Sequence, residues 1–260
     1  MDLTITTALV GSGLFIGMML CYELGRRLCL ARSARGHEDP TKGAGAAEAA
    51  VFGLMGLLIA FTFSGAAERF EARRHLITEE ANAIGTAWLR LDLLPAASQG
   101  PLRQAFRHYT ELRSTAYRHG GQSALQQQEQ ATTTALQNQI WQQALAASQH
   151  PQAAPQAGVL LLPALNEMFD ITTTRAMASQ NHPPLVVYLL LGILVLVGAL
   201  LIGFDTAANV QRSWLHIVVF AAIMSLAVFV IVDLEYPRQG LIRVDNADQV
   251  LSSLLAGMKP

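Results

Sequence analysis

The sequence contains little charge, and that charge avoids four long stretches. Asp, Glu, Lys and Arg make up only 14% of the 260 residues, and the mean hydropathy is positive. Residues 3–22, 49–67, 185–204 and 214–232 contain none of these four residue types. About 20 apolar residues cross a bilayer, and a charge at the centre of such a helix costs about 2.5–3.5 kcal/mol. The four stretches therefore predict a polytopic membrane protein with four transmembrane helices.

Other absences exclude whole classes of function. The sequence has no GxSxG, HExxH or P-loop motif, and no GxGxxG between a strand and a helix. We therefore expect no enzyme, no cofactor and no bound metal. The two cysteines are eight residues apart, which is neither a disulfide framework nor a metal spacing. A net charge of −1 without a basic patch argues against nucleic acid as a partner. The spans lack internal proline and central charge, which disfavours a secondary transporter.

The segments outside the membrane are predicted to be helical. No segment alternates apolar and polar residues long enough to predict a strand. One apolar stripe recurs at helical spacing after the second span, at Ile77, Ala81, Ile84, Trp88 and Leu91. Pro95 ends that helix, and Pro101 suits the first turn of the next. The Gln-rich run 123–149 predicts a peripheral helix with a narrow apolar stripe, and a fourth helix carries Leu161, Leu165 and Met168. The fold class is all-α.

These features divide the chain into four parts. The first transmembrane pair occupies 1–67, a helical extramembrane domain continuous with the second span occupies 68–183, the second transmembrane pair occupies 184–232, and a tail occupies 233–260. Lys and Arg near the span ends number six on each side, so the positive-inside rule does not decide the orientation.

The second span carries the clearest functional pattern. Met55, Ile59 and Phe63 are four residues apart and share one side of the helix. If several copies assembled around an axis, these side chains would form consecutive apolar rings, and a narrow apolar throat gates ions by excluding water. The alternative is that these residues simply face lipid.

Charged residues follow the second span without a helix breaker. Arg69 and Arg73 share one face, Glu68 and Glu71 lie between them, and Arg74 follows. A ring of arginines would concentrate anions and a ring of glutamates would concentrate cations, so the sign depends on which face points inward. Alternatively, the arginines at 69, 73 and 74 pair with Asp233 and Glu235, which leave the fourth span at the same boundary.

Several of these segments resemble a known family. The stretch LIAFTFSGAAERFEARR (58–74) is similar to the second-helix motif of bestrophins, with Phe61 at its Phe, Glu68-Arg69-Phe70 at its acidic-Arg-aromatic triplet and Arg74 at its later Arg. Residues 79–95, 161–175 and 233–244 resemble signatures of the bestrophin-like family of bacterial membrane proteins. The sequence departs from the bestrophin motif at Thr62, where Arg is frequent, and at Glu71-Ala72.

The resemblance implies a pentamer around a central pore with a hydrophobic neck on the second helix. Ile59 and Phe63 are then the best neck candidates. It also implies a bacterial inner membrane location, with the 68–183 domain and both termini in the cytoplasm. The sequence has no acidic cluster that would predict calcium gating.

Two hypotheses follow. The first is a homo-oligomeric, pentameric ion channel, favouring chloride-like anions, with Met55, Ile59 and Phe63 as the throat and Arg69 and Arg73 in the vestibule. Its partners would be the lipid bilayer, further copies of the chain and inorganic ions. The second is a non-conducting, membrane-anchored scaffold or signalling protein that docks a partner through its helical domain.

Overall fold

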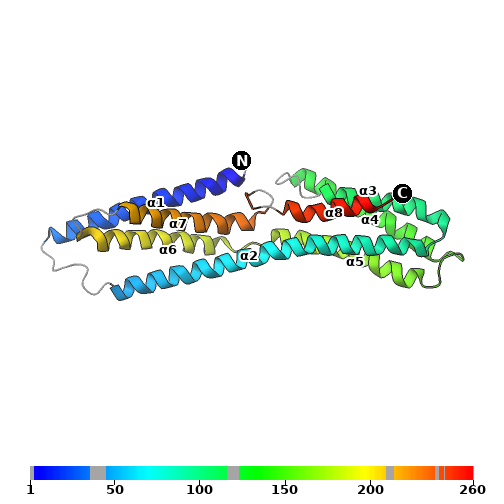
Figure 1. The fold of residues 1–260 in the computed structure, drawn as a ribbon, viewed down its shortest axis with the longest axis horizontal. Helices are drawn as coiled ribbons and strands as arrows, with labels where there is room; N and C mark the ends of the chain where they lie inside the picture. Colours follow the sequence, from blue (N-terminus) through cyan, green and yellow to red (C-terminus); the bar gives the residue numbers. More distant parts are fainter. Residues whose placement is uncertain are drawn as a thin grey trace. The chain divides into compact units, whose positions relative to one another are not determined.

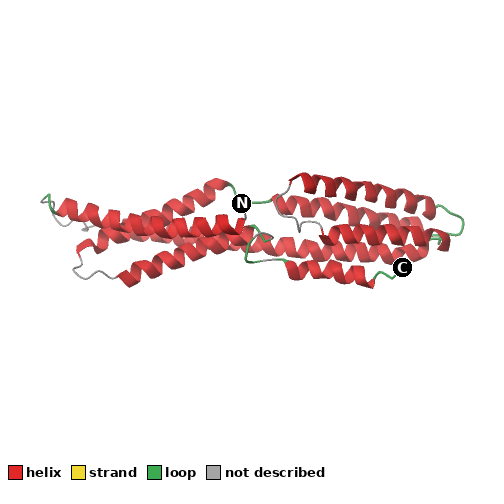
Figure 2. Cartoon of the chain, turned by 90° about the horizontal axis from the view of Figure 1, so that it is seen from above, coloured by secondary structure: helices red, strands yellow, loops and turns green. Residues whose placement is uncertain are grey.

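Every regular element in the described part of the chain is helical (Figures 1 and 2). The computed structural model describes residues 3–35, 45–115, 123–208, 214–237, 240–242 and 244–259. The elements are α1 (Leu3–Ser33), α2 (Gly45–Arg90), η1 (Leu91–Leu93), α3 (Ala96–Thr115), α4 (Ser123–Ser148), α5 (Ala157–Gln180), α6 (Leu185–Asp205), η2 (Thr206–Ala208), α7 (Trp214–Glu235) and α8 (Asp245–Gly257). Among these residues, four helices are long and apolar enough to span a membrane, which confirms the predicted fold class.

The chain forms two compact units. The membrane unit comprises residues 1–68 and 182–241, and the helical unit comprises residues 69–181 and 242–260. Helix α2 has 46 residues, whereas about 20 cross a bilayer, so a single helix supplies a span to the first unit and a core helix to the second. The division into four parts, with limits at 67/68, 183/184 and 232/233, stays a prediction.

Glycines allow the helices of the membrane unit to pack closely. Helix α1 lies along both α6 and α7. A Cβ added at Gly25 would collide with the backbone of Leu200 in α6, and one added at Gly203 would collide with the backbone of Tyr22 in α1. Without a hydrophobic driving force between helices in lipid, such small-residue contacts provide the packing that holds them together.

The helical unit has a conventional apolar core. The stripe predicted on α2 is buried, with Ile77, Ile84 and Leu91 at most 2% exposed. The narrow stripe predicted on α4 is also buried, from Leu136 and Ile140 to Ala147. Helices α3, α4 and α5 pack in sequence, and α8 returns to α3. The tail therefore packs on its own chain.

One predicted helix start is wrong. Helix α3 begins at Ala96, so Pro101 lies inside the helix rather than in its first turn. At this position proline keeps a helical φ but removes the hydrogen bond that its backbone N–H would make to the carbonyl four residues earlier. The extra turn, 96–100, contains no large apolar side chain that would predict a helix there from the sequence. Its start is stabilised instead by the Gln99 side chain, whose Nε2 donates to the Leu94 carbonyl at 2.8 Å.

Candidate functional site

One face of α2 packs against other helices of the membrane unit. Met55 is only 3% exposed. Its Sδ would lie 3.5 Å from a Cβ built at Gly198, so it fills the space that this α6 glycine leaves open. The Phe52 ring meets the Phe220 ring of α7 edge-on, with centroids 6.4 Å apart. Ala66 is fully buried on the same side.

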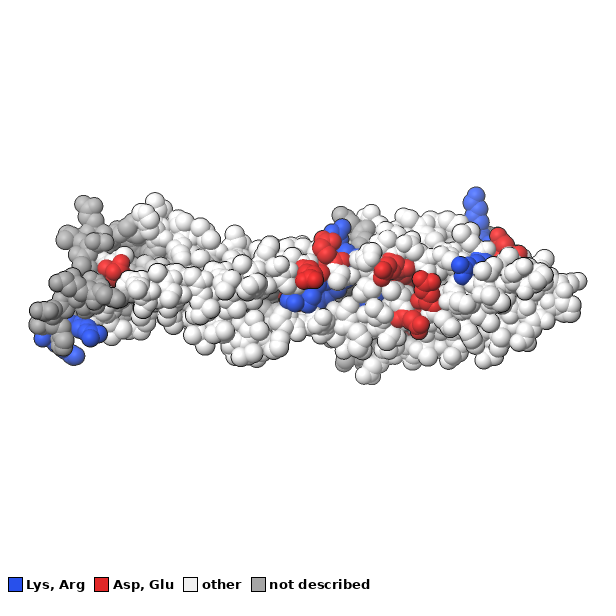
Figure 3. All heavy atoms as spheres, turned by 90° about the horizontal axis from the view of Figure 1, so that it is seen from below, with Lys and Arg blue, Asp and Glu red and all other residues white. Residues whose placement is uncertain are grey.

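The opposite face of α2 is bare. Leu57 and Phe61, which are four residues apart, are 52% and 67% exposed. Within the described residues, a Cβ built at Gly53 or Gly56 meets nothing within 4 Å. Only 11% of the apolar window of this helix is buried, against 17–28% for the other three candidate spans. The second span therefore presents an unusually open apolar surface, and Figure 3 shows the wide uncharged surface of the membrane unit on one side.

The three predicted throat residues run from the packed face to the exposed face. Each step of four residues turns a helix by about 40°. Accordingly, Met55 is buried, Ile59 is half-buried and Phe63 is 47% exposed. Their role in a throat stays a prediction. The exposed pair Leu57 and Phe61 lies outside the predicted set, although the bestrophin motif matches Phe61.

The arginines that follow the span differ in their surroundings. Arg73 donates from Nε to the Ala178 carbonyl at 3.0 Å and from Nη2 to the Asn181 carbonyl at 2.8 Å. These carbonyls lie at the C-terminal end of α5, where a helix leaves acceptors unsatisfied. Arg74 pairs with Glu71 at 2.7 Å and lies over the Phe70 ring, 5.9 Å from its centroid.

Two carboxylates on this part of α2 are more accessible than two of its three arginines, and the third, Arg74, is exposed. Glu68 and Glu71 are exposed, whereas Arg69 and Arg73 are half-buried. Further along the same helix, His75 Nε2 lies 3.1 Å from an oxygen of Glu79, and both side chains are exposed to solvent. At 100° per residue, 68, 71, 75 and 79 fall on one side of α2, so this exposed side is mainly acidic.

The two proposed counter-charges are fully buried in the membrane unit. An Asp233 oxygen accepts the backbone N–H of Leu241 at 3.0 Å, which closes the turn after α7. Glu235 Oε2 lies 3.4 Å from His182 Nδ1, and the His182 ring stacks on Tyr236 at 4.7 Å between centroids. Their pairing with Arg69, Arg73 or Arg74 stays a prediction.

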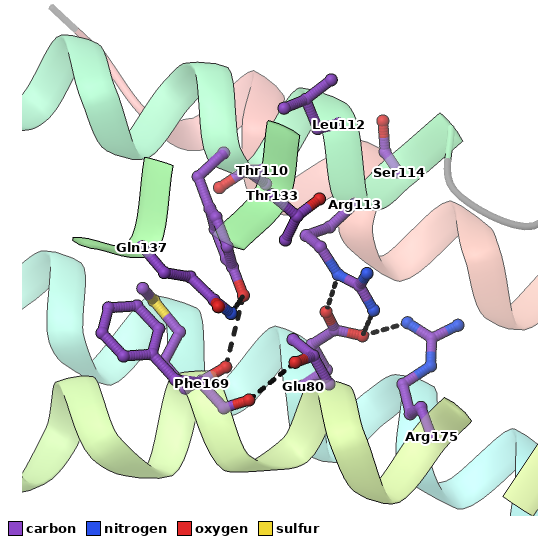
Figure 4. A network of polar contacts seen from close by, with 12 residues as sticks. Glu80, Thr110, Leu112, Arg113, Ser114, Thr133, Gln137, Phe169 and Arg175 are labelled. Atoms are coloured by element: carbon purple, nitrogen blue, oxygen red, sulfur yellow. Dashed lines mark hydrogen bonds and ion pairs between the residues drawn. The ribbon is translucent and has the colours of Figure 1, made fainter. Parts of the chain in front are cut away.

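A buried ionic network in the helical unit escaped the sequence reasoning (Figure 4). Glu80 of α2 is fully buried and accepts hydrogen bonds from Arg113 of α3 and Arg175 of α5, which are 7% and 6% exposed. Burial alone would raise the pKa of the Glu80 carboxyl, but the charges of Arg113 and Arg175 and their hydrogen bonds outweigh it and lower the pKa. The available signal was a charged residue beside the apolar stripe at Ile77 and Ile84.

In the described part of the chain, no three His, Cys, Asp or Glu side chains group closely enough to hold a metal ion.

Comparison with curated proteins gives no match. Solved structures give strong matches to the fold. A bestrophin homologue from Klebsiella pneumoniae with a tryptophan-to-alanine mutation has a TM-score of 0.73 at 14% identity, covering 96% of this chain and 97% of its own. A leucine-to-threonine variant of a Klebsiella pneumoniae homologue has a TM-score of 0.72 at 14% identity, with 94% and 98% coverage.

A third structure, described as a membrane protein with a proline-to-alanine mutation, has a TM-score of 0.72 at 14% identity and covers 95% of this chain and 98% of its own. At these identities the likeness shows the fold alone. The family model for the Bestrophin-like domain matches residues 22–248. Because that match covers most of the sequence, the chain belongs to the bestrophin-like family.

Proposed function

We propose that this chain is one subunit of a homo-oligomeric, pentameric ion channel in which α2 lines the pore. Family and fold support a channel-like membrane protein. The single observation that carries the proposal is the bare apolar face of α2, because a span that is only 11% buried in its own chain needs another environment. The proposed location is the bacterial inner membrane, with the helical unit and both termini in the cytoplasm.

The throat of this channel uses the exposed face of α2. Leu57 and Phe61 stack four residues apart on this face. Ile59 and Phe63 are two residues further along, so they point to a different side of the helix, nearer the packed face. Met55 supports the helix from behind through its contact with α6. Glycines at 53 and 56 leave room for neighbouring copies to approach. Consecutive apolar rings at this level would disfavour water and ions until they widen.

The exposure of the charges favours cations, the opposite of the sign expected from the sequence. Arg73 is engaged with the end of α5, and Arg74 with Glu71. Glu68 is exposed. A vestibule lined by this side of α2 would therefore carry a negative potential, which raises the local concentration of cations.

Ion flux from liposomes containing the purified protein tests the throat. We expect Leu57→Ala/Phe61→Ala, which removes bulk from the proposed throat, to conduct faster than wild type. The matched control is Leu189→Ala/Ile193→Ala on α6, where both residues are 56% exposed, and it should conduct like wild type. Flux equal to that of empty liposomes for wild type and the throat variant would instead favour the non-conducting scaffold. A monomeric mass in detergent would also contradict the ring.

Reversal potentials in a salt gradient test the sign. We expect cation preference in wild type, reduced in Glu68→Gln and unchanged in Glu111→Gln, which removes an exposed carboxylate from α3 instead. Anion preference in wild type would refute the acidic vestibule while leaving the channel itself intact.

A further inference from the structure

Helix α1 extends past the end of its neighbour α6. The two helices run parallel, since a Cβ built at Gly17 meets Leu196, one built at Gly203 meets Tyr22, and Thr206 lies 3.4 Å from the Tyr22 hydroxyl. Helix α6 ends at Asp205, whereas α1 continues to Ser33. Residues 26–33 therefore reach beyond α6 by about 12 Å, at about 1.5 Å per residue.

Helix α7 runs antiparallel to α1, and its first residue lies at the level along α1 at which α6 ends. A Cβ built at Gly11 of α1 would lie 3.7 Å from Phe229 and 3.9 Å from the Ser225 carbonyl. Counting back along α7 from that contact brings its first residue, Trp214, to the level of the last α1 residues before Arg26. Trp214 is 47% exposed, and exposed tryptophan at a span end is typical of the membrane–water interface. The turn of α1 that begins at Arg26 therefore lies in the polar headgroup layer, which is about 6 Å thick on each side of the hydrocarbon core, and the following residues lie just beyond it. The long side chains of Arg32 and Arg35 can extend back to the headgroups from there.

One exposed face of α1 changes from apolar to basic over these turns. Leu20 and Leu24 are 66% and 49% exposed. Arg27 and Leu28 follow one turn later, and Arg32 and Arg35 are exposed beyond them. The five residues within α1 fall on one side of the helix, at three-, four-, seven-, eight- or twelve-residue steps from Leu20 or Leu24, and Arg35 follows in the turn after Ser33.

The last two arginines have no acidic partner among the described residues. Arg27 pairs with Glu23 at 3.1 Å, and Arg26 lies 3.9 Å from the same carboxylate. The ion pairs of the described chain include neither Arg32 nor Arg35. Basic side chains gather at this end of the membrane unit (blue in Figure 3).

We propose that this face binds an anionic phospholipid, with Arg32 and Arg35 on the headgroup phosphate, Arg27 beside it and an acyl chain along Leu20 and Leu24. Arginine holds a phosphate through a planar fork of donors while its stem lies on apolar surface. The order of the residues along the helix matches the order of chain and headgroup in a lipid leaflet. The site depends only on the membrane placement of the chain, and it holds whether or not the protein conducts ions.

Native mass spectrometry of the purified protein, titrated with phosphatidylglycerol or phosphatidylcholine, tests the proposal. We expect wild type to retain phosphatidylglycerol more tightly than phosphatidylcholine. Arg32→Gln/Arg35→Gln should weaken phosphatidylglycerol binding by about fivefold for each arginine removed, because one cationic side chain near an anionic lipid surface contributes about a factor of five. Arg32→Lys/Arg35→Lys keeps the charge and should restore most of the binding.

The control is Arg74→Gln/Lys259→Gln, which removes two exposed positive charges from the helical unit and should bind like wild type. Melting curves in a neutral detergent establish that each variant is folded. Equal retention of the two lipids by wild type would overturn the proposal. So would phosphatidylglycerol binding by Arg32→Gln/Arg35→Gln that matches wild type, or an equal loss in the control.

Discussion

Removing the charge of Glu80 should destabilise the helical unit strongly. In Glu80→Gln the two guanidinium groups of Arg113 and Arg175 remain buried without the carboxylate that they share. Deleting one partner of a buried ion pair costs about 3–5 kcal/mol, because the remaining charge is neither solvated nor compensated. Since about 1.4 kcal/mol is a factor of ten, the lower value already shifts the local opening equilibrium by about 150-fold.

Hydrogen exchange followed by mass spectrometry measures this shift in the opening equilibrium, because the exchange rates of amides in α3 and α5 depend on local opening. The matched control is Glu79→Gln. It removes the neighbouring carboxylate, but Glu79 is 46% exposed and its ion pair among the described residues is with exposed His75, so its loss should cost at most about 1 kcal/mol. If α3 and α5 exchange equally in the two variants, the argument that the network holds these helices together is refuted.

The same network predicts the direction of the pH dependence. The pKa of Glu80 is lowered in the folded state, so its ionised form stabilises the fold above the ordinary carboxyl pKa. That contribution is lost as the pH falls from there through the lowered pKa of the folded state. Protection of α3 and α5 in wild type should therefore decrease in acid, and the difference between wild type and Glu80→Gln should shrink with it.

Two further predictions concern helix contacts. Gly203→Ala should lower the melting temperature, because a Cβ there collides with the α1 backbone. The control is Gly192→Ala on the same helix, where a Cβ meets nothing within 4 Å and the melting temperature should not change. Equal melting temperatures for the two variants would contradict the close approach of α1 and α6. Arg73→Gln removes two hydrogen bonds to carbonyls at the end of α5 and should lower the local stability of that helix end by about 1–3 kcal/mol. The measurement is amide hydrogen exchange, which should become faster there. Unchanged exchange would show that those carbonyls need no partner.

Helix periodicity predicted most of the fold. The stripe through Ile77 and Ile84 and the narrow stripe through Ile140 are buried as the spacing of apolar residues indicates. The adjacent residues Glu79 and Glu80 point in different directions, as helix geometry requires, since Glu79 is exposed and Glu80 is fully buried. These successes have one cause: where polar residues cover one side of a helix and apolar residues the other, the buried face is visible in the sequence.

The membrane span gives no such signal, because lipid and protein core are both apolar. Nothing in the residues around Met55 distinguishes its buried side from the exposed side of Leu57 and Phe61. The distinction comes from Gly198, more than 140 positions later, which makes room for Met55. The buried ionic network of the helical unit likewise depends on a partner distant in sequence, because Arg175 of α5 pairs with Glu80 of α2.

The same reason explains why the ion preference that we propose differs from the one expected from the resemblance. Along the sequence, Glu68, Arg69, Glu71 and Arg73 alternate, and neither sign dominates. Folding makes the exposure of these side chains unequal, because the carbonyls at the end of α5 accept hydrogen bonds from a guanidinium and repel a carboxylate. An arginine is therefore drawn toward the protein at this level while a glutamate is left in solvent. The end of α5, packed beside α2, thus selects which of two interleaved charges reaches the water, without altering the composition of α2 itself.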